Sequence, residues 1–327
     1  MNLKKNKLLD NIKSLDFLSI LIAYIIVIAV FAPSSRHFLT IRNFLNVGQY
    51  AAVIGTMATS MTLIIVSGNI DISLGSIVAL SGMFVAAFTP SDPGNIGGLL
   101  FAMFLGVLTG AVCGLINGFF VTRVKVNAFI TSMATMNIFR GLGYILYKGK
   151  SISVTNPGLG IIGRGRLFGV FPNTLIVLAI SVIVFWFIAK YTVFGRRMFI
   201  IGGNPTAAFL SGIKVDNSVL CIFIINGAMT GLAGVMTTSQ LGAALPQGSS
   251  GLEFQVISAI ILGGASLSGG KGSMIGSLFG VLLLATLNNG MVMMKIPAYW
   301  QLVVMGVVLI LAVSIDVLKT RRFSLQK

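Results

Sequence analysis

Ten apolar stretches divide this chain of 327 residues and leave little sequence between them. A helix needs about 20 apolar residues to cross the hydrocarbon core of a bilayer, and most of the stretches approach that length. One of them is too short to cross alone and predicts a half-helix or a re-entrant piece. The stretches are 17–32, 44–66, 72–89, 98–121, 128–146, 173–190, 219–237, the short 254–265, 274–294 and 299–317.

The composition excludes a soluble protein. Hydrophobic residues make up 56% of the chain and charged residues 9%, and the mean hydropathy is +0.97. Short alternating segments of the kind that build membrane β-barrels are absent from the pattern. We therefore expect an all-α, polytopic helical bundle with eight to ten membrane segments, formed by residues 1–327 as a single domain.

The net charge of +16 is best explained as a topology signal. Lysines precede the first span, and the chain closes on "LKTRRFSLQK". Because cytoplasmic loops carry the excess of Lys and Arg, both termini are expected in the cytoplasm. The basic residues lie in short loops, so a nucleic-acid partner is not expected. Cys113 and Cys221 fall in apolar stretches, which predicts no disulfide or metal site.

A glycine-rich run, "ILGGASLSGGKGSMIG" at 261–276, resembles a phosphate-binding loop but fails its pattern. Ala265 occupies the place of the first glycine, and Gly272 follows Lys271 where the metal-binding hydroxyl should be. The run therefore predicts a cytoplasmic turn between two spans, and we expect no bound nucleotide or other cofactor. The run at 68–76, "GNIDISLGS", resembles it and predicts a second turn of the same kind.

The loop 191–218 carries helix signals outside the membrane. Arg196 and Arg197 precede a Gly202–Gly203 break. Asn204 suits an N-cap and the following proline suits the first helical position, while Ser211–Gly212 would end the helix. A short helix on the cytoplasmic face has the shape of a docking element, and an ordinary ordered loop is the alternative.

Few ionisable residues fall within or beside the spans, where each charge costs at least about 2.5–3.5 kcal/mol. Asp71 can cap the following helix with the help of Ser73, or have a role in a pathway. Arg140 is expected to reach toward the outer interface. Glu253 either caps the short eighth segment or faces an aqueous cavity.

Uncharged polar residues recur inside the spans. They either join helices through hydrogen bonds or line a pathway for a neutral, polyhydroxylated solute. Catalytic motifs are absent from the sequence, so an enzyme is not expected. These residues are Thr56 with Ser60, Thr131 with Thr135, Asn226 with Thr230, and Asn117, Asn288 and Asn289.

Five segments together resemble the membrane permeases of bacterial ABC sugar importers, the group that contains the ribose permease. They are "SGNIDISLGSIVALSG", "GAVCGLINGFFVTRVKVNAFITSMATM", "FGRRMFIIGGNPTAAFLSGIKV", "AIILGGASLSGGKGSMIGSLFGVLLLATLNNG" and "LILAVSIDVLK". The resemblance implies a coupling segment at 195–215 that contacts an ATPase, and within it roles for Asn204, Ala207, Ala208, Gly212 and Ile213. Asp71 and the run containing Lys271 match signature positions. Asn127 stands where the family commonly has proline, which leaves the local helix geometry open.

The resemblance also implies the location and the partners. These are a multi-pass position in the bacterial inner membrane, a separate ATP-binding cassette subunit, an extracytoplasmic solute-binding protein and a second permease chain. The implied substrate is a monosaccharide such as ribose. Importers of branched-chain amino acids, nucleosides or an autoinducer sugar remain alternatives, and a secondary carrier or channel acting alone is the alternative from another class.

Overall fold

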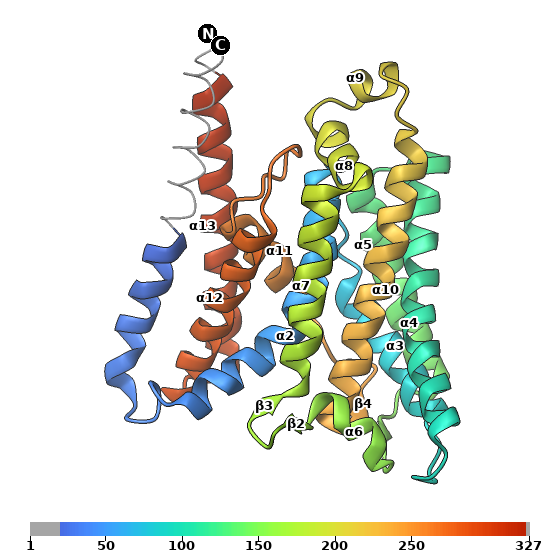
Figure 1. Ribbon diagram of the computed structural model, residues 1–327, viewed down its shortest axis with the longest axis vertical. Helices are drawn as coiled ribbons and strands as arrows, with labels where there is room; N and C mark the ends of the chain where they lie inside the picture. The colour runs from blue at the N-terminus through green and yellow to red at the C-terminus, as the bar shows by residue number, and fades with distance from the viewer. Residues whose placement is uncertain (1–19, 325–327) are drawn as a thin grey trace.

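The computed structural model describes residues 20–324 as one bundle of helices standing side by side (Figure 1). The lysines of the expected cytoplasmic N-terminus, Lys4, Lys5, Lys7 and Lys13, lie outside the described residues. The helices that build the bundle are Ile20–Phe31, α2 (Ile41–Val66), α3 (Leu74–Phe88), α4 (Ile96–Phe119), α5 (Ala128–Leu146), α7 (Asn173–Tyr191), α10 (Val215–Leu241), α11 (Leu252–Leu262), α12 (Met274–Met293) and α13 (Ala298–Ser324).

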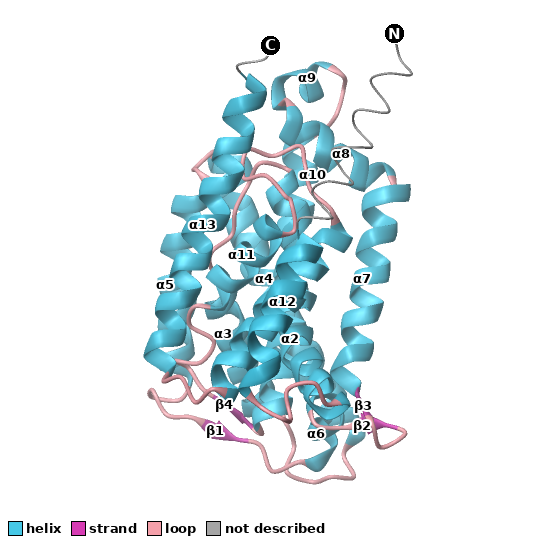
Figure 2. Ribbon diagram, turned by 90° about the vertical axis from the view of Figure 1, so that its left-hand side faces the viewer, coloured by secondary structure: helices cyan, strands magenta, loops and turns pink. Residues whose placement is uncertain are grey.

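Shorter elements lie at the two ends of the bundle. One end holds α8 (Val193–Gly203), α9 (Pro205–Leu210) and a π-helix, η2, that extends α4 (Phe120–Val124). The other holds η1 (Ala32–Ser34), α6 (Pro157–Gly163) and two antiparallel pairs of two-residue strands (Figure 2). The pairs are β1 (Ile152–Ser153) with β4 (Ala243–Ala244) and β2 (Arg166–Leu167) with β3 (Phe171–Pro172).

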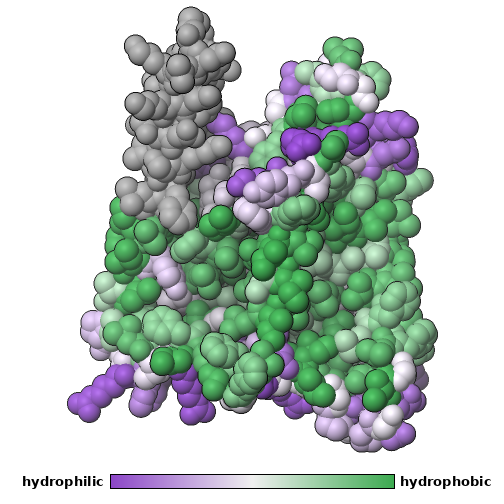
Figure 3. All heavy atoms as spheres, in the orientation of Figure 1, coloured by the Kyte–Doolittle hydropathy of each residue, from purple (hydrophilic) through white to green (hydrophobic). Residues whose placement is uncertain are grey.

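The prediction of a polytopic, helical membrane protein is confirmed. Each of the ten predicted stretches corresponds to one helix, and among the described residues five helices are long and apolar enough to cross a membrane: α2, α4 extended by η2, α7, α10 and α12. On the face in Figure 3, a broad hydrophobic band lies between hydrophilic ends. Because backbone groups in lipid must bond within the segment, a helical bundle is the fold that such a sequence can form.

Two of the helices cross only part of the bundle. From its 15 residues α3 spans about 22 Å, and α11 with 11 residues is shorter still. Residues 67–73 and 242–251 bring the chain from one end of the bundle to the first turns of these helices. The first turns meet, because a Cβ on Gly75 of α3 would overlap Ser249 O and Glu253 Oε2 at the start of α11. The short stretch 254–265 is thus a half-helix, and α3 is a second one.

The helices form two units of opposite orientation. α2 to α5 and α10 to α13 each contain a long helix, a crossover, a half-helix and two further helices. α3 packs on α4 and α5 as α11 packs on α12 and α13, and α10 packs on α3 and α4 as α2 packs on α11 and α12. α2 and α10 run in opposite directions (Figure 1). This is the pattern of an inverted repeat, which the sequence comparison of the two glycine runs did not reveal.

The prediction that both glycine runs form the same turn is wrong for the first run. Only Gly68 turns, with a φ of 80°. Residues 69–73 then continue without helical structure into the bundle, where Asp71 is completely buried. The local sequences are similar, but burial of the Asp71 carboxylate requires the residues after Gly68 to descend between helices instead of leading straight into the next helix.

Glycine allows α4 and α10 to pack backbone against backbone. Gly106, Gly110, Gly114 and Gly118 recur every four residues along one face of α4. A Cβ on Gly110 would overlap Gly227 O of α10 and lie 2.7 Å from the Gly231 Cα. Lipid supplies no hydrophobic drive between helices, so such close contact is what holds a helix pair together in a bilayer.

Substitution of Gly110 by alanine is therefore expected to separate α4 from α10. Overpacking of a fitted contact costs about 1–3 kcal/mol, so the melting temperature of the purified protein in detergent should fall. Gly141→Ala on α5 is the matched control, because no heavy atom outside its own turn lies within 4 Å of that Cβ position. Equal melting temperatures for the two variants would contradict the close packing.

Candidate functional site

A buried carboxylate organises the interior of the bundle. Asp71 is fully buried just before α3. Its Oδ1 accepts hydrogen bonds from the backbone N–H of Ser73 at 2.9 Å, the Ser73 hydroxyl at 2.6 Å and the Asn117 amide at 3.3 Å. Its Oδ2 accepts one from the Asn226 amide at 3.2 Å. The carboxylate thus joins the start of α3 to α4 and α10.

The same cluster extends to α2. Ser60 donates to Asn226 Oδ1 at 2.9 Å, and the Asn117 amide also donates to Ser73 Oγ at 2.9 Å. The cap prediction for Asp71 is wrong in its detail: Ser73 occupies the N-cap position, and the Asp71 carboxylate accepts from Ser73 rather than from an N–H of the first turn of α3. What the sequence did not show is that Asn117 and Asn226 arrive from other helices. We call Asp71, Ser73, Asn117, Asn226 and Ser60 the polar cluster.

A second acidic residue lies where the two half-helices meet. Glu253 is in the first turn of α11, is 5% exposed, and accepts the N–H of Gly251 at 3.1 Å. Gly251 is the N-cap of α11 and no side chain caps the helix, so Glu253 lies at the helix start without the predicted capping bond. Arg140 attracts Glu253 electrostatically and donates to the carbonyls of Pro246 and Gly248 at 2.9 and 2.6 Å. Arg140 therefore holds the crossover 242–251 rather than only reaching toward the interface as expected.

The remaining pathway candidates lie apart from these groups. Asn289 exchanges two hydrogen bonds with Asn43 of α2, at 3.0 and 3.1 Å, and Asn288 is half-buried beside it. Asn127 caps α5 by accepting the N–H groups of Phe129 and Ile130. The helix begins at Ala128, so the absent proline does not disturb it.

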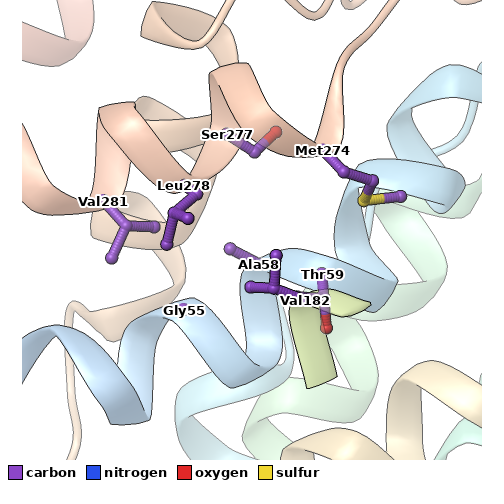
Figure 4. Close-up of a pocket in the computed structure, with 8 residues that line it drawn as sticks. All are labelled: Gly55, Ala58, Thr59, Val182, Met274, Ser277, Leu278 and Val281. Atoms are coloured by element: carbon purple, nitrogen blue, oxygen red, sulfur yellow. The ribbon is translucent and has the colours of Figure 1, made fainter. Parts of the chain in front are cut away.

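The cavities described inside the bundle are small. The one between α2, α7 and α12, lined by Gly55, Thr59 and Met274 among others, measures about 10 Å³, which is room for about one water molecule (Figure 4). A larger one of about 140 Å³ lies between α3, α10 and residues 243–249. Neither forms a route across the bundle.

In the segment 195–215, the predicted helix is present. Asn204 ends α8 and caps α9, and its side chain accepts the N–H of Ala207 at 3.0 Å. Pro205 is the first residue of α9, Ser211 is the C-cap, and Gly212 follows with a φ of 80°. The predicted start of α9 at Asn204–Pro205 and its predicted end at Ser211–Gly212 are therefore confirmed.

The exposed side chains of this segment differ from the expected ones. Ala208 is fully buried against the same chain, where α9 packs on α8 and α10, so it presents no surface for docking. Ile213 is half-buried, whereas Phe209 and Leu210 are 70% and 79% exposed. Arg196, Arg197, Gly203, Asn204, Ala207 and Gly212 are also exposed. In Figure 3 hydrophobic surface at α9 lies beyond the hydrophilic rim and outside the main apolar band.

The turn interpretation of the Lys271 run is confirmed. Residues 263–273 join α11 to α12 without helix, and Gly264, Gly269 and Gly270 all have positive φ, as a tight glycine turn requires. Ser266 N–H donates to Lys271 O at 3.1 Å within this loop. Asp316 of α13 accepts from Ser266 Oγ and Leu267 N, each at 3.2 Å.

Sequence reasoning missed Asp316 and the exposed pair Phe209–Leu210 as site residues. Asp316 lies in the motif "LILAVSIDVLK", and an acidic residue in an apolar stretch is the sequence signal for it. Which face of α9 is exposed depends on the packing of α8 and α10, so no local signal exists for it.

Comparisons with known proteins identify the family of the chain. The family described as "Branched-chain amino acid transport system / permease component" matches residues 43–313. The chain is 40% identical over 296 residues to the ribose import permease protein of Bacillus subtilis, covering 89% of each chain. It is 35% identical over 300 residues to that of Escherichia coli K12, covering 90% of this chain and 92% of the relative.

A sugar permease of different specificity is also similar. The L-arabinose ABC transporter permease protein of Azospirillum brasilense is 33% identical over 298 residues, covering 91% of this chain and 86% of the relative. No solved structure matches the chain. With a family match over residues 43–313 and relatives up to 40% identical, the chain belongs to this family of transport-system permease components.

Proposed function

We propose that this chain is the permease subunit of an ATP-driven importer for a monosaccharide such as ribose, in the cytoplasmic membrane of a bacterium. The observation that carries the proposal is the apolar tip of α9, Phe209 and Leu210, beyond the polar rim. Apolar side chains outside the lipid-facing band fit a protein partner better than lipid. That partner is a separate ATP-binding subunit, which would supply the energy.

The substrate class rests on two observations. The relatives named above are permeases for ribose and L-arabinose, although the family description names branched-chain amino acids. The interior is rich in amides and hydroxyls, and Asp71 is already satisfied by four hydrogen bonds. Neutral donors and acceptors suit a polyhydroxylated solute rather than a charged one. Delivery by an extracytoplasmic binding protein and passage between two permease chains complete the proposed mechanism.

Reconstitution tests the proposal directly. Vesicles that contain this chain, its ATPase subunit and its binding protein should take up labelled ribose only when ATP is present on the ATPase side. If the substrate is a related pentose, that unlabelled pentose should reduce the uptake of labelled ribose. Uptake by the chain alone, driven by an ion gradient without ATP, would assign it to the secondary carriers instead. Uptake of leucine but not ribose would select the branched-chain amino-acid alternative.

If α9 docks in the ATPase subunit, a charge on its exposed tip should weaken the binding of that subunit. Leu210→Asp places a charge on the exposed apolar tip, where it would be desolvated in a protein cleft, so copurification of the ATPase should fall about tenfold or more. Phe168→Asp is the control, since Phe168 is 88% exposed on the hairpin at the opposite end of the bundle. Unchanged copurification with Leu210→Asp would remove α9 from the interface.

The topology can be checked by labelling. Thr206 in α9 and Ser153 in β1 are both exposed, and the two elements lie at opposite ends of the bundle (Figure 2). In intact cells, an impermeant thiol reagent should modify Ser153→Cys and leave Thr206→Cys unmodified until the membrane is opened. The reverse result would place α9 outside and exclude an ATPase partner there.

A further inference from the structure

Three backbone segments meet without side chains between them where α8 ends. Gly270 N–H, in the α11–α12 loop, donates to Val66 O at the end of α2 at 2.8 Å. Gly202 lies against this bond. A Cβ on it would overlap the Val66 carbonyl and lie 2.6 Å from Gly270 N. We call Val66, Gly68, Gly202, Gly269 and Gly270 the glycine junction.

The junction also includes the start of the first crossover. A Cβ on Gly269 would lie 2.8 Å from Gly202 O and 3.0 Å from the Gly68 Cα. Gly68, Gly269 and Gly270 have φ values of 80°, 81° and 74°, which only glycine adopts without strain. Since contacts below 3.4 Å are tight for real side chains, a Cβ on Gly202, Gly269 or Gly270 would have to move a neighbouring backbone. At Gly68 a Cβ would meet only the Gly202 Cα, at 3.8 Å, and the positive φ is what favours glycine.

Each segment of the junction leads directly to a different part of the molecule. Gly202 is one residue from the end of α8 and two from Asn204, which caps α9. Gly68 is three residues from Asp71 of the polar cluster. The loop that contains Gly269 and Gly270 lies between α11 and α12 and is bound to Asp316 of α13. The junction is therefore the place where the end of α8 contacts both the first crossover, 67–73, and the α11–α12 loop.

We propose that the glycine junction is a rigid connection that transmits displacement of α8–α9 to the segment 67–73 and to the α11–α12 loop, with Gly202 as its positioning residue. The inference rests on the proposed docking of α9 with an ATPase. Backbone-to-backbone contact has no rotamers that could absorb a movement, so a shift of α8 reaches Gly68 and Gly270 directly. Close-packed contacts have low compressibility, so they transmit a displacement rather than absorb it.

The pair Gly202→Ala and Gly203→Ala tests this. Both residues end α8, but a Cβ on Gly203 meets no atom within 4 Å. In the reconstituted transporter, Gly202→Ala should keep the ATPase bound and hydrolysing ATP while the number of ribose molecules moved per ATP falls about tenfold or more. Gly203→Ala should leave that ratio unchanged. An unchanged ratio in an inserted, folded Gly202→Ala protein would overturn the proposal, and so would loss of ATPase binding, which would make Gly202 part of docking alone.

A second arm covers the case in which Gly202→Ala does not fold. Cysteines replacing Gly203 and Lys271, both exposed and beside the junction, are joined by a short thiol cross-linker with Gly202 intact. A rigid connection predicts that the cross-linked protein still transports at the rate of the single-cysteine controls treated with the same reagent. Transport that stops on cross-linking and returns on cleavage would show that the segments slide past one another and would refute the rigid junction. Failure of the docking proposal itself is recognised separately, because the unsubstituted chain would then bind no ATPase.

Discussion

Burial of the Asp71 carboxylate is the constraint on which the centre of this bundle depends. An ionisable group at membrane depth costs at least about 2.5–3.5 kcal/mol unless its oxygens are satisfied. Four hydrogen bonds from Ser73, Asn117 and Asn226 supply that satisfaction. Asn117 and Asn226 can both reach Asp71 only because α4 and α10 pack through glycine, at Gly114 and Gly227. The close packing of α4 on α10 and the helix break before α3 therefore depend on each other, because both are needed to surround Asp71 with donors.

The features that the sequence predicted well are those that depend only on residues close together along the chain. Apolar length gave ten helices, because hydrocarbon thickness and helical rise fix how many residues a span needs. The Asn204–Pro205 start of α9 and the glycine turn before Lys271 follow from capping and φ preferences that act within a few residues. The short stretch 254–265 likewise revealed a half-helix, since its length alone excludes a full crossing.

The features that sequence could not provide are those that depend on distant partners. The stretch 72–89 was long enough to be read as a full span, yet α3 begins only at Leu74, below a crossover that enters the bundle. Asn226 lies 155 residues from Asp71. Ala208 belongs to a helix of six residues whose buried face is selected by α8 and α10, so its role could not be separated from that of Leu210 by pattern. The type of side chain was enough to identify candidate residues, but which residues contact one another could be known only from the folded structure.

Glycine has two different physical roles in this structure, one between α4 and α10 and one at the glycine junction. Along α4 and α10 it lets the helices approach until dispersion contacts replace the hydrophobic drive that a bilayer cannot provide. At the glycine junction it brings three non-helical or helix-terminal backbones together, where positive φ at Gly269 and Gly270 is a condition of the approach. The first use resists motion because many atoms pack along two long helices. The second joins short segments at one point, so the unit can move as a whole while its internal geometry stays fixed.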